Sequence, residues 1–165
     1  MRHAIEFHAD RMTEQKFGSV ESWGVIDEML GAWRLQRPST ASRGVTIGKV
    51  VAMRVGDTGP FFLGMLSALV QETDGRIVAT ITLFPGKPEP VAVRAGDARN
   101  RANAKWSEAF RLPESPKLKV PMTFVVPSGL AQRGRGIDLW TDGAKESTVY
   151  EIVERGADFD RITIF

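Results

Sequence analysis

Apolar and polar residues alternate with a period of two in several parts of the chain, as they do in β-strands with one buried face. Residues 79–83 alternate aliphatic side chains with threonines, and residues 161–164 alternate isoleucines with arginine or threonine. Residues 61–66 and 124–126 are nearly continuous apolar runs, which fit strands buried on both faces. Turn signals rich in glycine separate such segments, at residues 56–60, 74–75, 85–86 and 142–143. The pattern predicts an all-β protein, folded as an antiparallel sandwich or barrel.

The order of these segments divides the sequence into four parts. Residues 97–119 are polar and charged and contain Pro113 and Pro116, which interrupt strand pairing because proline donates no ladder hydrogen bond. We expect, in order, a leader at 1–19, a β-barrel at 20–96, a connecting segment at 97–119 and a C-terminal β unit at 120–165. The last part has about four predicted strands, so it forms either a second small barrel or a β-rich extension of the first sheet.

Two stretches have the apolar spacing of short helices, residues 5–17 and 98–110. No apolar run approaches the roughly 18 residues that a membrane-spanning helix needs, and the N-terminus does not have the pattern of a secretion signal. The chain has no cysteine, which fits a reducing compartment. We therefore expect a cytoplasmic protein without membrane insertion.

Composition and charge exclude several classes of function. Without cysteine there is no disulfide, catalytic thiol or cysteine-bound metal. The only histidines, His3 and His8, lie in the expected leader, which leaves none for a nucleophile–base pair or a metal site in the barrel. Lys plus Arg exceed Asp plus Glu by only 22 − 20 = 2, so general attraction to nucleic acid is weak unless the charge is clustered. We expect no enzymatic activity, no cofactor and no metal.

Residues 23–35 carry the most specific motif of the chain. Asp27 stands near the end of an expected strand, and a small-residue turn at Gly31 and Ala32 leads into a second strand. This arrangement resembles the PilZ family, small bacterial β-barrels that bind the second messenger cyclic di-GMP, over roughly residues 20–96. The resemblance implies a PilZ-like antiparallel β-barrel with a signalling role. An unrelated SH3-like or OB-like barrel is the alternative for the same strand pattern.

The PilZ ligand motifs are only partly present. The family carries Asp/Asn-x-Ser-x-x-Gly at an early turn, and here Asp27 keeps the acidic position while Met29 replaces the serine and Ala32 the final glycine. The family also carries Arg-x-x-x-Arg ahead of the barrel, but no two arginines of this chain have that spacing. Guanine recognition depends on planar arginine forks, which a lysine point charge does not replace. The degenerate candidate ligand residues implied by the resemblance are Arg11, Lys16, Asp27, Gly31, Arg34 and Arg37.

Other clusters offer weaker candidates. Arg133 and Arg135 alternate with glycines between two expected strands, where they could hold an anion, although a polar hairpin loop is the simpler interpretation. Residues 99–106 combine arginines, a lysine and Trp106, but one aromatic residue is few for a single-strand binding groove. Trp23 and Trp33 are expected in the core, whereas Trp140 fits the core and an interface equally well.

Three functions follow from these observations. The favoured hypothesis is a non-enzymatic PilZ-like regulatory or adaptor domain that has an eroded cyclic di-GMP site and acts through a protein partner. The alternative is a working cyclic di-GMP receptor that uses Asp27, Gly31, Arg34 and Arg37. The third is a barrel that binds single-stranded nucleic acid, which the nearly balanced charge makes unlikely.

Overall fold

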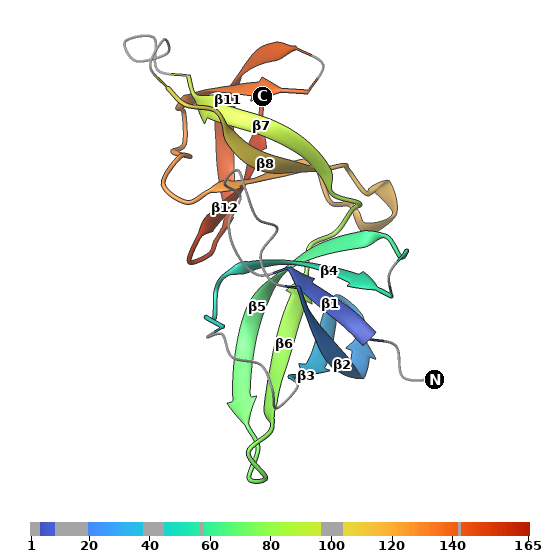
Figure 1. Ribbon diagram of the computed structural model, residues 1–165. Coiled ribbons are helices and arrows are strands. Elements are labelled where there is room, and N and C mark those ends of the chain that lie inside the picture. The colour runs from blue at the N-terminus through green and yellow to red at the C-terminus, as the bar shows by residue number, and fades with distance from the viewer. Residues whose placement is uncertain (1–3, 9–19, 38–44, 57, 97–103, 142) are drawn as a thin grey trace. The chain divides into compact units, whose positions relative to one another are not determined.

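The computed structural model describes residues 4–8, 20–37, 45–56, 58–96, 104–141 and 143–165, and strands dominate these residues (Figure 1). Twelve β-strands and one short 3-10 helix, Pro116–Leu118, lie within them. The all-β class predicted from the alternation of apolar and polar residues is therefore confirmed. None of the helical structure in these ranges is long and apolar enough to cross a membrane.

The strands form two closed six-stranded barrels, one in each of two compact units, Met1–Lys87 and Pro88–Phe165. The strands of the first barrel are β1 (Ala4–His8), β2 (Val20–Met29), β3 (Ala32–Gln36), β4 (Val50–Val55), β5 (Phe61–Gln71) and β6 (Ile77–Leu83). The strands of the second are β7 (Glu89–Ala95), β8 (Ser107–Leu112), β9 (Thr123–Pro127), β10 (Gly136–Trp140), β11 (Ala144–Arg155) and β12 (Phe159–Ile164). The strands of residues 120–165 belong to a second closed barrel, which β7 and β8 complete.

Both barrels connect their strands in the same way. In the first, β1–β2–β3 and β4–β5–β6 are antiparallel meanders, and the barrel closes because β1 pairs with β4 and β3 with β6. In the second, β7–β8–β9 and β10–β11–β12 are joined by the pairs β7–β10 and β9–β12. Closure satisfies the backbone groups that an open edge would leave unpaired. Six strands also distinguish each barrel from the five-stranded OB-fold.

The structural division differs from the boundaries expected from the sequence. Residues 4–8 of the expected leader form β1, which pairs with β2 on one side and β4 on the other. β7 lies in the expected first barrel but belongs to the second, and β8 lies within the expected connecting segment. The two prolines that suggested a connection follow β8 instead of interrupting it. The helices predicted at 5–17 and 98–110 are wrong for residues 5–8, which pair with β2 and β4, and for residues 107–110, which pair with β7.

Each barrel has its own apolar core. In the first, Trp23 is almost completely buried and Trp33 packs against the same cluster, its ring centroid 5.6 Å from that of Phe62. The predicted core position of Trp23 is confirmed, and Trp33 is partly buried there. The alternation predicted for β6 also holds, because Ala79 and Ile81 point inward. The buried residues of this cluster are Trp23, Leu35, Val51, Met53, Leu66, Ala79 and Ile81.

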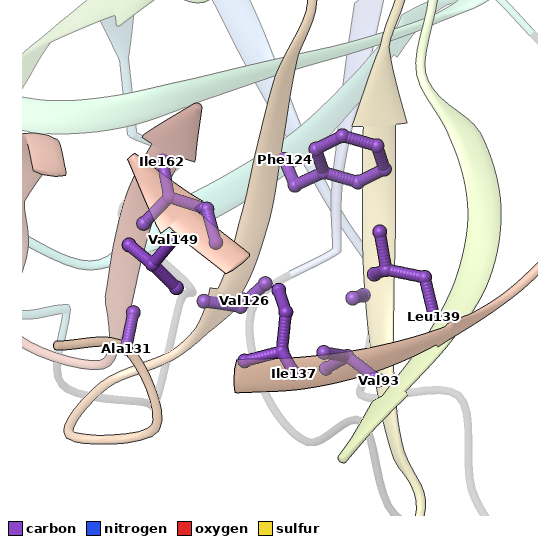
Figure 2. Packing of buried hydrophobic residues seen from close by; sticks show 9 residues of the cluster. Val93, Phe124, Val126, Ala131, Ile137, Leu139, Val149 and Ile162 are labelled. Carbon is purple, nitrogen blue, oxygen red and sulfur yellow. The ribbon is translucent and has the colours of Figure 1, made fainter. Parts of the chain in front are cut away.

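The second core is filled by aliphatic side chains and one phenylalanine. Figure 2 shows these side chains meeting between strands of both meanders, with Phe124 and Val126 from β9 facing Ile137 and Leu139 from β10. Ile162 comes from β12, as its alternation with Arg161 predicts. The remaining buried residues of the cluster are Val93, Ala109, Ala131 and Val149. Because side chains fill the interior, chemistry with a ligand is left to the outer faces and the ends of the barrels.

Gly64 allows β5 and β6 to approach closely. A Cβ atom at this position would lie 2.6 Å from the carbonyl oxygen of Thr82 and 2.7 Å from Cγ2 of Ile81. One of these atoms belongs to the backbone, so the contact cannot be relieved by a side-chain rotation alone. A larger residue at this position therefore forces the two strands apart.

We expect Gly64→Ala to destabilise the first barrel by about 1–3 kcal/mol, because the added methyl group forces backbone shifts in a packed core. Urea denaturation monitored by tryptophan fluorescence measures this change. Gly24→Ala in β2 is the matched control, since its Cβ would meet nothing closer than 3.9 Å. An unchanged unfolding midpoint for Gly64→Ala would contradict the close approach of the two strands.

Candidate functional site

The β2–β3 hairpin brings Asp27 and Arg34 together. Asp27 lies directly opposite Arg34 in the antiparallel register, and Arg34 is flanked on its other side by Thr80 of β6. The hairpin turns at Leu30 and Gly31, and Gly31 has the positive φ of 78° that favours glycine. Its carbonyl accepts a hydrogen bond of 2.8 Å from the backbone N–H of Leu83. The turn therefore favours glycine at position 31, and the backbone carbonyl of this residue attaches the hairpin to β6.

A β-bulge decides on which face Asp27 lies. Trp23 and Val25 belong to the core side of β2, so strict alternation would also place Asp27 inside the barrel. The register shifts between Val25 and Asp27, which adds one residue to β2 at this point. Asp27 consequently pairs with Arg34, which faces outward because its neighbours Trp33 and Leu35 contribute to the core. The aspartate and this arginine share the outer surface of the barrel.

Arg37 lies in a different environment from Arg34. It follows the end of β3, and its guanidinium Nη2 lies 3.4 Å from Oε1 of Glu21. The same guanidinium lies 5.8 Å from the ring centroid of Trp23, whose indole N–H donates to the other oxygen of Glu21 at 3.1 Å. The Arg37 side chain is only 9% exposed. Arg37 is therefore part of a buried cluster with Glu21 and Trp23.

Asp74 and Arg76 lie in the β5–β6 turn, and Arg76 contacts Gln36 at the end of β3. The backbone N–H of Arg76 donates to Asp74 at 3.1 Å and is the main reason why the pKa of Asp74 lies below its ordinary value. Arg76 also reaches Gln36 of β3, with Nη1 at 3.3 Å from Oε1. A lowered carboxyl pKa stabilises the fold above the unfolded pKa, and this contribution is lost as the pH falls. Asp74 is exposed, so the turn is a solvated structure.

The candidate ligand residues of the first barrel do not gather at one place. Three positions separate Arg34 from Arg37, which is roughly 10 Å along a strand and includes a change of face. Asp27 and Arg34 lie together on the outer face, whereas Arg37 packs against Trp23. The other two candidates, Arg11 and Lys16, lie outside the described residues.

Arg133 and Arg135 lie in the β9–β10 loop, which is braced by hydrogen bonds. The N–H of Gly134 donates to Val149 at 2.8 Å, and the N–H of Val149 donates to Arg135 at 2.9 Å, which extends the β10–β11 pairing into the loop. The Arg135 side chain donates to the carbonyl of Leu130 at 3.4 Å, while Arg133 is exposed. The two arginines therefore have unequal roles, and Arg135 helps to shape the loop.

Asp160 anchors the start of the same loop. It is buried in β12 and accepts the N–H of Gly129 at 3.1 Å, with Nε of Arg155 at 3.8 Å from its other oxygen. β12 pairs with both β9 and β11, so Asp160 does not lie on an edge strand. Among the described residues, no group of three or more histidine or carboxylate side chains could hold a metal ion.

A cluster on the second barrel brings together Trp106 and Trp140, which the sequence analysis considered separately. Arg94 of β7 donates from Nε to Asp138 of β10 at 2.8 Å, and its guanidinium lies 4.5 Å from the ring centroid of Trp106. Trp106 in turn meets Trp140 edge to face, with centroids 5.9 Å apart. Sequence reasoning treated Trp106 as a lone aromatic residue, because the two tryptophans come together only through the pairing of β7 with both β8 and β10.

Comparison with known proteins adds little to these observations. No family model and no curated protein matches the sequence. Among solved structures, the chain is similar to MrkH, described as a novel c-di-GMP-dependent transcription regulatory factor, with 9% identity and a TM-score of 0.34. The alignment covers 99% of this chain and 76% of that one. At this identity and TM-score the match carries no argument, so the PilZ resemblance rests on strand order and on the motif around Asp27.

We expect Arg37→Ala to destabilise the first barrel by about 1–3 kcal/mol, since it leaves the partly buried Glu21 without this cation and exposes Trp23. Arg34→Ala, the matched control on the outer face of β3, should change stability by no more than about 0.5 kcal/mol. Urea denaturation of both variants measures the difference. Equal stabilities would contradict a structural role for Arg37.

Proposed function

We propose that this chain is a regulatory or adaptor module without enzymatic activity, built on PilZ-like barrels and acting through contacts with a protein partner. The observation that carries the proposal is the separation of its candidate ligand residues. Asp27 and Arg34 share the outer face of the first barrel, while Arg37 is buried against Glu21 and Trp23. The bacterial and cytoplasmic setting implied by the resemblance belongs to the same proposal.

Separated arginines are poorly suited to hold a guanine dinucleotide. A guanine edge is recognised by a planar guanidinium fork, and a second arginine adds affinity only when it reaches the same ligand. Bringing Arg37 to the ligand would first require breaking its ion pair with Glu21 and its contact with Trp23. Replacing the motif serine by Met29 also removes a hydroxyl that could bind a phosphate. These features support an eroded nucleotide site.

The use of arginine elsewhere in the chain supports the same conclusion. Arg94, Arg111 and Arg161 all form ion pairs with carboxylates, namely Asp138, Glu89 and Glu154. Arginines held in this way strengthen strand pairing and are less available to a polyanionic ligand. The described surface also carries exposed aromatic side chains, among them Phe61, Trp140 and Tyr150, and aromatic residues are enriched at protein interfaces.

Titration calorimetry of the full chain with cyclic di-GMP tests this proposal. We expect no binding tighter than about 100 µM, because the fork geometry is missing. Arg34→Ala and Asp27→Ala should leave this result unchanged. Micromolar binding that either substitution weakens strongly would overturn the proposal in favour of a receptor. Salt-sensitive binding to a single-stranded oligonucleotide would instead favour a nucleic-acid-binding barrel.

A further inference from the structure

We propose that the outer part of β5, residues 67–71, is an open strand edge through which two copies of this chain pair around a two-fold axis. The inference goes beyond the proposed function and does not depend on it, because self-association neither requires nor excludes a different protein partner. The interaction surface is this edge of the first barrel, and its occupant is the same edge of a second copy.

β5 continues past the strand that flanks it on one side. β4 pairs with β5 only as far as Met65, and the residues just before β4 then bond to the backbone of Leu66. On the other side, β6 continues alongside β5 as far as Gln71. Figure 1 shows β5 and β6 running together beyond β4 toward their hairpin. Among the described residues, no strand pairs with the β4 side of residues 67–71.

The hydrogen-bonding pattern identifies the backbone groups on this open side. The N–H of Glu72 donates to the carbonyl of Arg76 at 2.8 Å, so Glu72 faces β6. Successive strand residues direct their backbone groups to opposite sides, and Val70 therefore also faces β6. Leu69 and Gln71 direct their N–H and C=O groups to the open side. The edge thus offers a donor and an acceptor at each of these two positions.

The second barrel has the corresponding edge, but there it is protected. β11 takes the place of β5 in the shared connectivity, and its outer part, residues 150–155, pairs with β12 alone among the described strands. Two register shifts interrupt the pairing of β11 with β12, and the outer part carries Glu151, Glu154 and Arg155. Bulges and charged side chains are the devices that prevent pairing of an exposed edge.

The edge of β5 lacks this protection. Residues 67–71 read Ser-Ala-Leu-Val-Gln and carry no charge and no proline. The register shift of β5 lies at the inner end of this stretch, between Leu66 and Ala68, and the pairing with β6 is regular from there outward. A flat, uncharged edge is a template for another strand. The contrast between the two barrels therefore indicates that this edge is kept open for pairing.

The energetics favour a partner strand that is already ordered. Fixing the backbone of a flexible peptide costs, for each residue, as much free energy as one backbone hydrogen bond returns, or more. A free peptide on so short an edge therefore gains little. In a second copy of the chain, β5 is held extended by its pairing with β6, so it loses little freedom when it pairs again.

One antiparallel register uses every open group of both copies. Leu69 pairs with Gln71 of the second copy and Gln71 with its Leu69, and each pair exchanges two hydrogen bonds. Val70 then lies on the two-fold axis, opposite its own counterpart. Its side chain is 54% exposed on the outer face, because the neighbouring Leu69 packs against the core. Valine therefore packs on valine, and Ala68 meets Glu72 of the second copy, so no like charges face each other.

The strength of the pairing should be modest. Specific, stable interfaces bury at least about 1,200 Å², which is more than two short strand edges provide, so we expect a weak dimer with a Kd of about 0.1–1 mM. Sedimentation velocity of the full chain from about 20 µM to about 2 mM covers this range. Hydrogen exchange measured by NMR should show that the amide protons of Leu69 and Gln71 become protected as the concentration rises.

A charge exchange at the two-fold axis tests the register. Val70→Lys and Val70→Glu each place like charges opposite one another and should each raise the Kd at least about tenfold. A mixture of the two variants should dimerise again, because opposite charges then meet. Val153→Lys is the matched control, since Val153 is 43% exposed on the protected part of β11. It should leave the Kd unchanged. All these positions are exposed, so the variants should remain folded.

Gln71→Pro tests the backbone pairing itself. Proline removes the N–H that points to the open side, and it removes no hydrogen bond to β6. Gln71 is exposed, so little packing is lost. We expect the Kd to rise at least about tenfold while the urea unfolding midpoint stays close to that of the parent chain.

Several results would overturn the inference. They are a chain that remains monomeric over the whole concentration range, a dimer that Val70→Lys or Gln71→Pro leaves intact, and a charge-exchanged mixture that does not dimerise. A hexapeptide of alternating valine and threonine probes the other occupant. If the chain stays monomeric and this peptide shifts the amide signals of Leu69 and Gln71, the edge belongs to an extended segment of another protein and the second copy is excluded.

Discussion

The structure depends on the backbone pairing that closes each barrel. β1 must meet β4, and β7 must meet β10, or each half of the chain would be an open sheet with two unpaired edges. Closure also divides every strand into an inner face, which the core fills, and an outer face. With the interior occupied, recognition is left to the outer surfaces, to the loops and to the stretch of β5 that continues past β4. The Asp27–Arg34 pair and the tryptophan pair both lie on outer surfaces.

The arginines show how the same residue type can be used for different ends. Their planar guanidinium groups suggested binding to phosphates or guanine bases. In the structure, Arg37 completes a buried cluster in the first barrel, and Arg94 links two strands of the second while it supports a tryptophan. The carboxylates that pair with them keep the local charge low.

Much of the fold could be predicted, because period-two alternation survives wherever a strand faces the core on one side. β6 and β12 were predicted for this reason. β8 was missed since Ala109 and Leu112, its buried residues, have a spacing of three that also fits a helix. β1 was missed because its identity as a strand depends on pairing with β4, far along the chain. Closure of the two barrels depends on pairing between strands that are far apart in the sequence, so the pattern of a single segment does not predict it.

The candidate site was predictable only in part, for similar reasons. The proximity of Asp27 and Arg34 followed from a hairpin that the turn residues indicated. The different position of Arg37 could not be predicted from that hairpin, because it depends on strand alternation and on Glu21 in a neighbouring strand. Of the two tryptophans of the second barrel, Trp106 immediately precedes β8 and Trp140 ends β10, and these two strands do not pair with each other. Only the shared neighbour, β7, brings them together.

The shared connectivity of the two barrels has a consequence for synthesis on the ribosome. The N-terminal strand cannot gain its second neighbour until residue 55 has been translated, so the nascent first half remains open for most of its length. Its last strand ends at Leu83, before the second half begins at Pro88. The first half can therefore close while the second is still being made. Successive closure shortens the time for which exposed strand edges from both halves coexist and could pair wrongly.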